Sequence, residues 1–231
     1  MHDLIDFHDE AGDLYWSAIH TGWATFLAAL LNPLLPEGFQ AWPGVTRRQE
    51  GDAVVLRSEN AWLDGEESVV VAEPRRVIGV EASATFAEVR IVRDDHTLAG
   101  LVELVSPSNL DRPSSRGVIC GKVEAALHDG VGVAWIDTVT THSANLHRLL
   151  LQSLGEPDPE ADPLYAASYA KAKRHNELAV WYEPLAVGRP VVDLPLTLKG
   201  GPQVMLPLAA SYEELWERMP LDASADAVAK P

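Results

Sequence analysis

The sequence is short of cysteine, of long apolar runs and of positive charge. Cys120 is its only cysteine, so no disulfide can form within the chain, and this favours a reducing compartment. The longest apolar stretch, residues 26–35, is interrupted by Asn32 and Pro33 and is too short to cross a bilayer. The first ten residues are acidic and lack the pattern of a secretory signal. We therefore expect a cytoplasmic protein with no membrane partner.

The shortage of positive charge restricts the nucleic acids that the protein could hold. The chain has 18 lysines and arginines against 34 aspartates and glutamates, a formal net charge of −16. Binding to nucleic acid usually relies on basic patches that release counterions from phosphate. We predict no tight, sequence-independent binding to duplex DNA. Nucleic acid remains a candidate substrate, because the acidic residues of an enzyme can include metal ligands. No feature of the sequence indicates an oligomeric state.

What is present is the composition of a globular α/β protein. Apolar residues make up 47 % of the 231 residues and charged residues 23 %, close to the globular average. A chain of this length can form one large domain with a well-buried core. We predict a single domain over residues 1–221, made of a core at about 14–152 and a C-terminal extension at about 163–220. Residues 222–231 are predicted to be a disordered tail.

The first half of the chain reads as a helix followed by strands. Apolar residues at three- and four-residue spacing predict an amphipathic helix over 14–31. Strands are predicted at 53–56, 68–72, 85–93 and 99–106. The sequence TFAEVRIVR alternates apolar and polar residues, as in a strand with one solvated face, and GLVELVS is apolar almost throughout. The turn sequence DDHT between them predicts a β-hairpin.

The second half begins with a predicted βαβ unit and ends with the extension. Residues 116–128 read as a helix and GVGVAWIDTV as a buried strand, so this strand should lie parallel to the strand before the helix. A further helix is predicted at 142–154, and ELAVWYEP and VVDLPLTL read as strands. SYEELWERM predicts a closing helix with Ser211 and Glu214 spaced as a capping box. Its Tyr212, Leu215 and Trp216 are expected to be buried.

Two segments carry a family resemblance. LVELVSPSN and GKVEAALHDGVGVAWIDTV resemble an uncharacterised bacterial family known as domain of unknown function 4058, and the likeness covers about residues 14–220. The central block also resembles, more distantly, the Uma-two-like putative endonucleases of the PD-(D/E)XK nuclease superfamily. In those proteins a strand ending in E-V-x-S-P-S precedes a helix that carries a lysine, and a strand ending in aspartate follows.

The resemblance implies a restriction-endonuclease-like core, a mixed α/β sheet with flanking helices, to which a C-terminal β/helix extension is added. It also implies a set of site residues. Asp52 takes the first acidic position, Glu103 the second, Lys122 is a lysine displaced onto the helix, and Asp137 closes the last strand. Asp52 and Glu103 would bind Mg²⁺ or Mn²⁺, and Glu103 and Lys122 would be catalytic. Asn109 is a further candidate. The position two after Glu103 is Val105, so the usual E-x-K lysine is absent.

The residues themselves leave alternatives open. Glu103 lies in an apolar strand, where an ionised carboxylate is costly unless it is paired or bound to a metal. Its other interpretation is a glutamate at a sheet edge or paired with an arginine. Gly-Asp at Asp52 is also an ordinary turn, and Lys122 could be a solvated helix residue. Asp137 could cap its strand or pair with an arginine, and Asn109 could cap the next helix.

Other chemistries find little support. The sequence contains no G-x-S-x-G and no Walker-type loop, and its single cysteine has no C-x-x-C partner. No organic cofactor is implied. The resemblance therefore implies a metal-dependent phosphodiester hydrolase of the PD-(D/E)XK kind, active or degenerate. The alternative is a non-catalytic interaction or scaffold protein that keeps the nuclease-like fold, and a small-molecule binding protein is a third class.

Overall fold

The computed structural model describes residues 12–49, 83–157, 159, 161–172 and 177–218. Its helical elements are α1 (Gly12–Leu31), a short 3-10 turn (Asn32–Leu34), α2 (Pro107–Leu110), α3 (Pro113–His128), α4 (Leu146–Ser153) and α5 (Leu208–Arg218). Its strands are β1 (Phe39–Gln49), β2 (Ser83–Arg93), β3 (Leu98–Leu104), β4 (Gly132–Asp137), β5 (Tyr165–Lys171), β6 (Leu178–Pro184), β7 (Leu194–Thr197) and β8 (Gln203–Leu206).

Six strands form one mixed sheet in the order β1-β2-β3-β4-β5-β6, and β7 and β8 form a second, antiparallel sheet. Within the large sheet β3 and β4 run parallel, and every other neighbouring pair is antiparallel. The parallel pair is joined through α3, as a crossover connection requires. The predicted fold class, a mixed α/β sheet with flanking helices and a C-terminal β/helix extension, is therefore confirmed. The predicted hairpin is the β2–β3 pair, and the predicted βαβ unit is β3–α3–β4.

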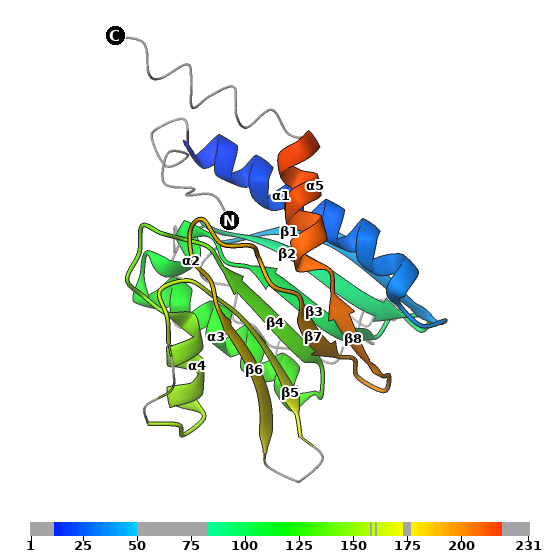
Figure 1. The fold of residues 1–231 in the computed structure, drawn as a ribbon. Coiled ribbons are helices and arrows are strands. Elements are labelled where there is room, and N and C mark those ends of the chain that lie inside the picture. The colour runs from blue at the N-terminus through cyan, green and yellow to red at the C-terminus, as the bar shows by residue number, and fades with distance from the viewer. Residues whose placement is uncertain (1–11, 50–82, 158, 160, 173–176, 219–231) are drawn as a thin grey trace, which may run out of the picture.

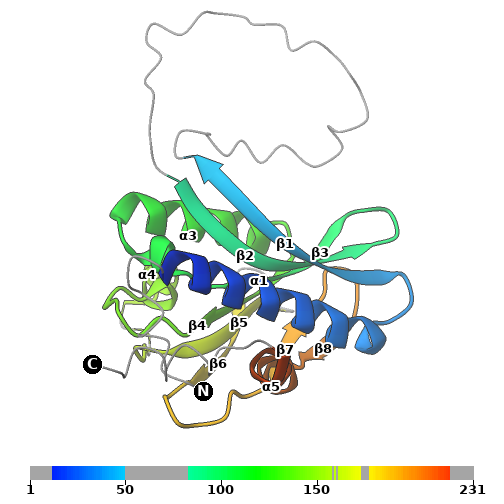
Figure 2. The ribbon, with the colours of Figure 1, turned by 90° about the horizontal axis from the view of Figure 1, so that it is seen from above.

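The two faces of the sheet are covered by different elements (Figures 1 and 2). α1 packs on β1 and β2, α5 packs on α1, and the β7–β8 hairpin lies against β4 and β5 on the same face. α3 packs on the opposite face, against β4 and β5, with α4 beside it. Because side chains alternate along a strand, Ala87, Val89 and Ile91 of β2 are buried under α1, whereas Glu88 and Arg90 belong to the α3 face.

The second sheet lies very close to the first. A Cβ atom at Gly132 of β4 would lie 2.0 Å from the carbonyl oxygen of Thr197, so only glycine fits where β7 crosses. At Gly100 of β3 a Cβ would lie 3.0 Å from side-chain atoms of Ile91 and Leu198. The absence of side chains at these two positions lets β7–β8 pack directly on the backbone of the large sheet.

The closing helix is docked as expected, but it begins earlier than its sequence indicates. Tyr212 and Leu215 are buried, and Trp216 is partly buried against the core. The predicted capping box is wrong, because α5 starts at Leu208 and Ser211 lies inside it. The first turn is instead capped from outside the helix, since the Ala209 amide donates to Asp193 Oδ1 at 2.9 Å.

Strands β1, β5 and β8 were not predicted from the sequence, and the remaining differences are smaller. The helix predicted at 142–154 begins at Leu146, with Asn145 Oδ1 accepting from the Arg148 amide at 2.8 Å as its N-cap. The strands predicted at 53–56 and 68–72 lie outside the described residues, as does the predicted tail. Within the described part of the chain, no helix is both long and apolar enough to cross a bilayer.

Ser211 links α5 to α1, and its loss should cost stability. Trp23 of α1 donates from its indole Nε1 to Ser211 Oγ at 3.0 Å in a buried site. In Ser211→Ala this N–H loses its partner, which typically costs about 1–3 kcal/mol. We expect a matching fall in the free energy of unfolding, measured by urea denaturation. Trp23→Phe removes the donor as well, so the added effect of Ser211→Ala in that background should nearly vanish. Full additivity of the two changes would contradict the proposed pairing.

Candidate functional site

Two glutamates face each other across the β2–β3 hairpin. Glu88 and Glu103 are directly paired in the antiparallel register, on the α3 face of the sheet. β3 is an interior strand, so Glu103 is not a sheet-edge residue. The two residues retain 3 % and 1 % of their exposure. Directly opposed side chains lie about 5 Å apart at Cβ, so the backbone itself brings these carboxylates together.

Lys122 of α3 points at both carboxylates. Its Nζ donates to Glu88 Oε2 and to Glu103 Oε1, and its side chain is 18 % exposed. It is therefore not a solvated helix residue, and the partner of Glu103 is a lysine rather than an arginine. Neighbouring Ile119 and Val123 are buried, so the packing of α3 on the sheet fixes the direction of the lysine.

Burial and charge act against each other in this cluster. Burial raises the pKa of Glu103, the Lys122 ammonium lowers it, and the Glu88 carboxylate raises it again, which brings it to about 7. Burial lowers the pKa of Lys122, but the two carboxylates outweigh burial and raise it above its ordinary value. Lys122 therefore stays an ammonium at neutral pH, whereas Glu103 exchanges its proton close to neutrality.

The cluster has the donors that a hard divalent cation takes. Among the described buried polar atoms, Glu103 Oε2 is one that has no hydrogen-bond partner. Mg²⁺ is commonly held by one or two carboxylates, with water completing its shell. No group of three histidine, cysteine, aspartate or glutamate side chains converges in the part of the chain that the structure describes. Glu88 and Glu103 are the carboxylates that could hold such an ion in place of Lys122.

Asp137 lies near this cluster but not in it. It ends β4 two residues after Trp135, the register neighbour of Glu103, so its Cα lies about 8 Å from that of Glu103. Its Oδ1 accepts from the Val139 amide at 3.0 Å, and its Oδ2 is buried without a partner. Burial raises its pKa to about 7, and the Val139 hydrogen bond lowers it only in part. Asp137 caps the end of its strand, as one interpretation of the sequence expected.

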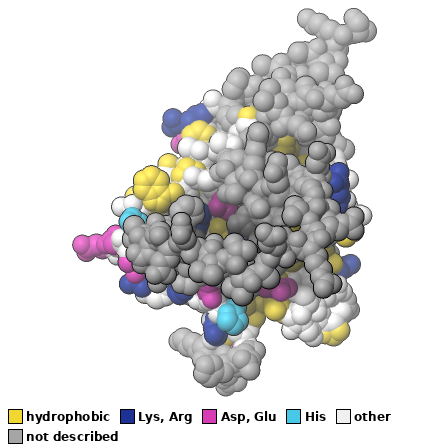
Figure 3. Space-filling view, turned by 180° about the vertical axis from the view of Figure 1, so that it is seen from behind, with side chains coloured by type: hydrophobic (Ala, Val, Ile, Leu, Met, Phe, Trp, Pro, Cys, Tyr) yellow, Lys and Arg dark blue, Asp and Glu magenta, His cyan; other side chains and the backbone are white. Residues whose placement is uncertain are grey.

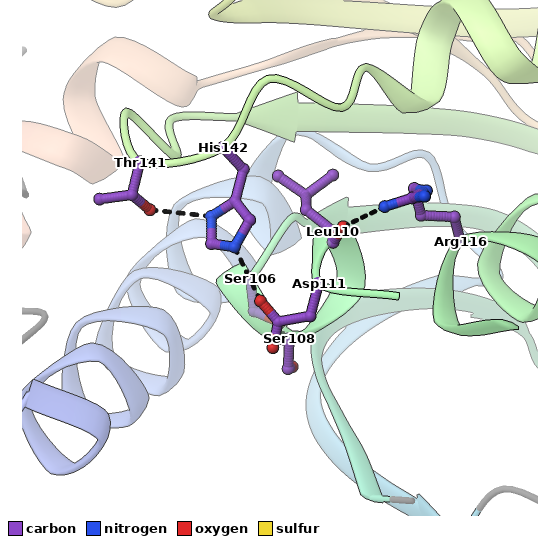
Figure 4. A network of polar contacts seen from close by, with 7 residues as sticks. All are labelled: Ser106, Ser108, Leu110, Asp111, Arg116, Thr141 and His142. Atoms are coloured by element: carbon purple, nitrogen blue, oxygen red, sulfur yellow. Dashed lines mark hydrogen bonds and ion pairs between the residues drawn. The ribbon is translucent and has the colours of Figure 1, made fainter. Parts of the chain in front are cut away.

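Asn109 organises the loop between β3 and α3. Its Oδ1 accepts from the Ser106 amide at 2.8 Å, the capping arrangement expected for it. Figure 4 shows the next connection, in which His142 joins Thr141 to Asp111. The His142 Nδ1–Thr141 Oγ1 distance is 2.9 Å, and the Nε2–Asp111 Oδ1 distance is 2.7 Å. These contacts tie the segment after β4 to the segment before α3, which positions the helix that carries Lys122.

Of the residues singled out in the sequence, the structure brings Glu103 and Lys122 into contact. Asp137 and Asn109 lie near the same ends of β3 and β4 with structural hydrogen bonds of their own, and Asp52 lies outside the described residues. Glu88 was missed. The DDHT turn indicated the hairpin but not its register, because Val92 pairs with Leu98 and an irregularity between Ile91 and Val92 sets the offset that pairs Glu88 with Glu103.

No family model matches the sequence, and comparisons with curated proteins and with solved structures found no significant match.

Proposed function

We propose that the protein is a metal-dependent phosphodiester hydrolase of the PD-(D/E)XK kind. The observation that carries this proposal is that Glu88 and Glu103, which lie on paired strands, both contact the ammonium group of Lys122. In this assignment, Glu88 is the first of the two acidic metal ligands among the residues that the structure describes. Glu103 takes the second, and Lys122 is the displaced lysine.

The order of elements supports the same assignment. Among the described elements, a helix, three antiparallel strands, a crossover helix and a parallel strand come in the order α1, β1–β3, α3 and β4. This is the order expected from the resemblance to the uncharacterised family and to the Uma-two-like proteins. Glu103 lies on the strand before the crossover helix and Lys122 on that helix, as in that resemblance.

Each residue has a chemical role in the proposed reaction. Glu88 and Glu103 would hold Mg²⁺ or Mn²⁺ through carboxylate oxygens, one of which, Glu103 Oε2, has no other partner. The bound ion would polarise the phosphoryl group and lower the pKa of the attacking water. Lys122, released from the carboxylates by the incoming cation, would keep its proton and stabilise negative charge that develops on the phosphoryl oxygens.

The alternative is a non-catalytic protein that keeps the nuclease-like fold. One observation favours it: Lys122 already neutralises the two carboxylates, so the cluster is also a plausible structural ion-pair network. The two proposals differ in one measurable property. A catalytic site must exchange the lysine for a metal ion at millimolar concentration, and a structural network must not.

Metal binding is tested first, by thermal unfolding. Millimolar Mg²⁺ or Mn²⁺ should raise the melting temperature of the wild type by several degrees, because an ion at a hundredfold excess over Kd adds about 2.7 kcal/mol to the free energy of unfolding. Glu88→Gln and Glu103→Gln should each lose most of this response. Glu183→Gln, which removes an exposed strand glutamate, is the matched control and should respond like the wild type. An equal response in all four proteins would favour the non-catalytic alternative.

Hydrolysis is tested on labelled single-stranded and duplex oligonucleotides with Mg²⁺ or Mn²⁺. Each of Glu88→Gln and Glu103→Gln should slow cleavage at least about 100-fold, since the ion contributes several kcal/mol of charge stabilisation. Lys122→Met should remove cleavage as well, and Glu183→Gln should leave it unchanged. Metal stabilisation without any cleavage would mean that the site binds an ion but is not a phosphodiesterase.

A further inference from the structure

An exposed tryptophan lies on the same face of the large sheet as α3, outside the area that α3 covers. Trp42 of β1 is 58 % exposed, whereas its neighbour Ala41, on the other face of the strand, is 3 % exposed. Trp42 pairs with Arg90 of β2, and both lie on the same face as Glu88. In Figure 3, which looks onto the side of the sheet that carries α3, hydrophobic side chains reach the surface at one margin beside charged ones.

This tryptophan lies next to the carboxylate pair. Trp42 is diagonal to Glu88 in the β1–β2 register, a separation of about 7–8 Å between Cα atoms. Between the two on β1 is Gly44, which pairs directly with Glu88. A Cβ at Gly44 would lie 3.4 Å from Glu88 Cγ and 3.6 Å from Oε1. Glu88 therefore directs Oε2 to Lys122 and Oε1 toward the strand that presents Trp42.

We propose that Trp42 forms a subsite for an unpaired nucleotide of single-stranded nucleic acid. The base would stack on the indole of Trp42. The adjoining phosphodiester would then lie toward Glu88 and Glu103. This inference rests on the proposed hydrolase function and adds its substrate class.

Chemistry favours a single strand over a duplex here. A net charge of −16 opposes binding that depends on counterion release along a duplex. Stacking of a base on an aromatic ring depends much less on a basic surface and is available only where the base is unpaired. A tryptophan exposed on a strand, opposite an arginine and diagonal to a candidate metal ligand, supplies that contact.

Binding is measured by fluorescence anisotropy with a labelled oligo-deoxythymidine, in EDTA so that no hydrolysis occurs. The wild type should bind the single strand and leave a duplex of the same length unbound at physiological salt. Trp42→Ala should weaken binding roughly 5- to 150-fold, the equivalent of about 1–3 kcal/mol for one stacked base. Trp42→Phe keeps a ring and should retain most of the affinity, whereas Trp42→Leu should not.

Two matched variants separate this inference from the proposed function. Met205→Ala removes a similarly exposed apolar side chain from β8 and should bind like the wild type. Glu183→Gln removes an exposed glutamate far along the sheet order, on β6, and should also bind like the wild type in EDTA. Trp42-dependent binding supports the subsite even where hydrolysis fails. Cleavage that is insensitive to Trp42→Ala, or equal affinity of wild type and Trp42→Leu, would overturn the subsite and leave the hydrolase proposal standing.

Discussion

Lys122→Met should be among the most destabilising substitutions in the protein when no divalent cation is present. The change leaves Glu88 and Glu103 buried against each other without a cation between them. Removing one partner from a buried ion-pair network typically costs about 3–5 kcal/mol. For a chain of this length that corresponds to a fall in melting temperature of roughly 6–20 °C, measured by circular dichroism in EDTA.

Metal should rescue this variant more than it helps the wild type. In Lys122→Met the incoming Mg²⁺ or Mn²⁺ displaces no ammonium, so the melting temperature should rise further on addition of metal. Lys171→Met removes an exposed strand lysine and is the control, with little expected change. If Lys122→Met does not fold in EDTA, the triple variant with Glu88→Gln and Glu103→Gln should recover. Equal stability of Lys122→Met and Lys171→Met would show that the lysine does not neutralise the pair.

The stability of the metal-free protein should fall as pH rises from about 4 to 7. The pKa of Glu103 is raised from 4.5 to about 7, and that of Asp137 from 3.8 to about 7. The folded chain therefore holds protons that the unfolded chain releases, so stability is greatest below the unfolded pKa values and is lost as pH passes through the folded ones. The expected loss is a few kcal/mol per carboxyl at most, measured by urea unfolding at pH 5 and pH 8.

Two variants show how much of the pH dependence of stability comes from each carboxyl group. Asp137→Asn and Glu103→Gln should each flatten the curve, mainly by raising stability at pH 8. Asp95→Asn is the control, because hydrogen bonds from Thr97 lower the pKa of that exposed carboxyl. Protonation at low pH reduces the overall negative charge of all these proteins alike. The test is therefore whether the slope of stability against pH differs between a variant and the wild type. Unchanged slopes in both site variants would mean that these carboxyls ionise normally in the folded state.

Local patterns in the sequence were enough for the helix–hairpin–βαβ order. The spacing of apolar residues gave α1, and the alternation in TFAEVRIVR with the DDHT turn gave β2 and β3. Glu103 was identified because a carboxylate in an apolar strand needs a partner. Lys122 was identified because it is the only lysine among the first 170 residues.

What the sequence missed depends on contacts between distant segments. The alternation of apolar and polar residues in TFAEVRIVR assigned Glu88 to a solvated face. That face is covered at this position, and Glu88 is buried. β5 was missed because its YAASYAK is rich in small residues, and its burial comes from packing on both faces. The start of α5 was misplaced because its cap, Asp193, lies sixteen positions before the capped amide. Each error concerns a contact with a distant segment, which the local sequence pattern does not predict.

The close approach of β7 to Gly132 has a consequence for how the chain is made. The ribosome delivers β1–β6 before β7, β8 and α5, so the face of β3 and β4 that β7 covers stays bare while those strands emerge. A nascent chain that stops short of residue 194 therefore presents apolar sheet surface to solvent and to chaperones. We expect the protein to complete its folding only after release of the C-terminal segment, and chains stalled before β7 to be degraded or to aggregate.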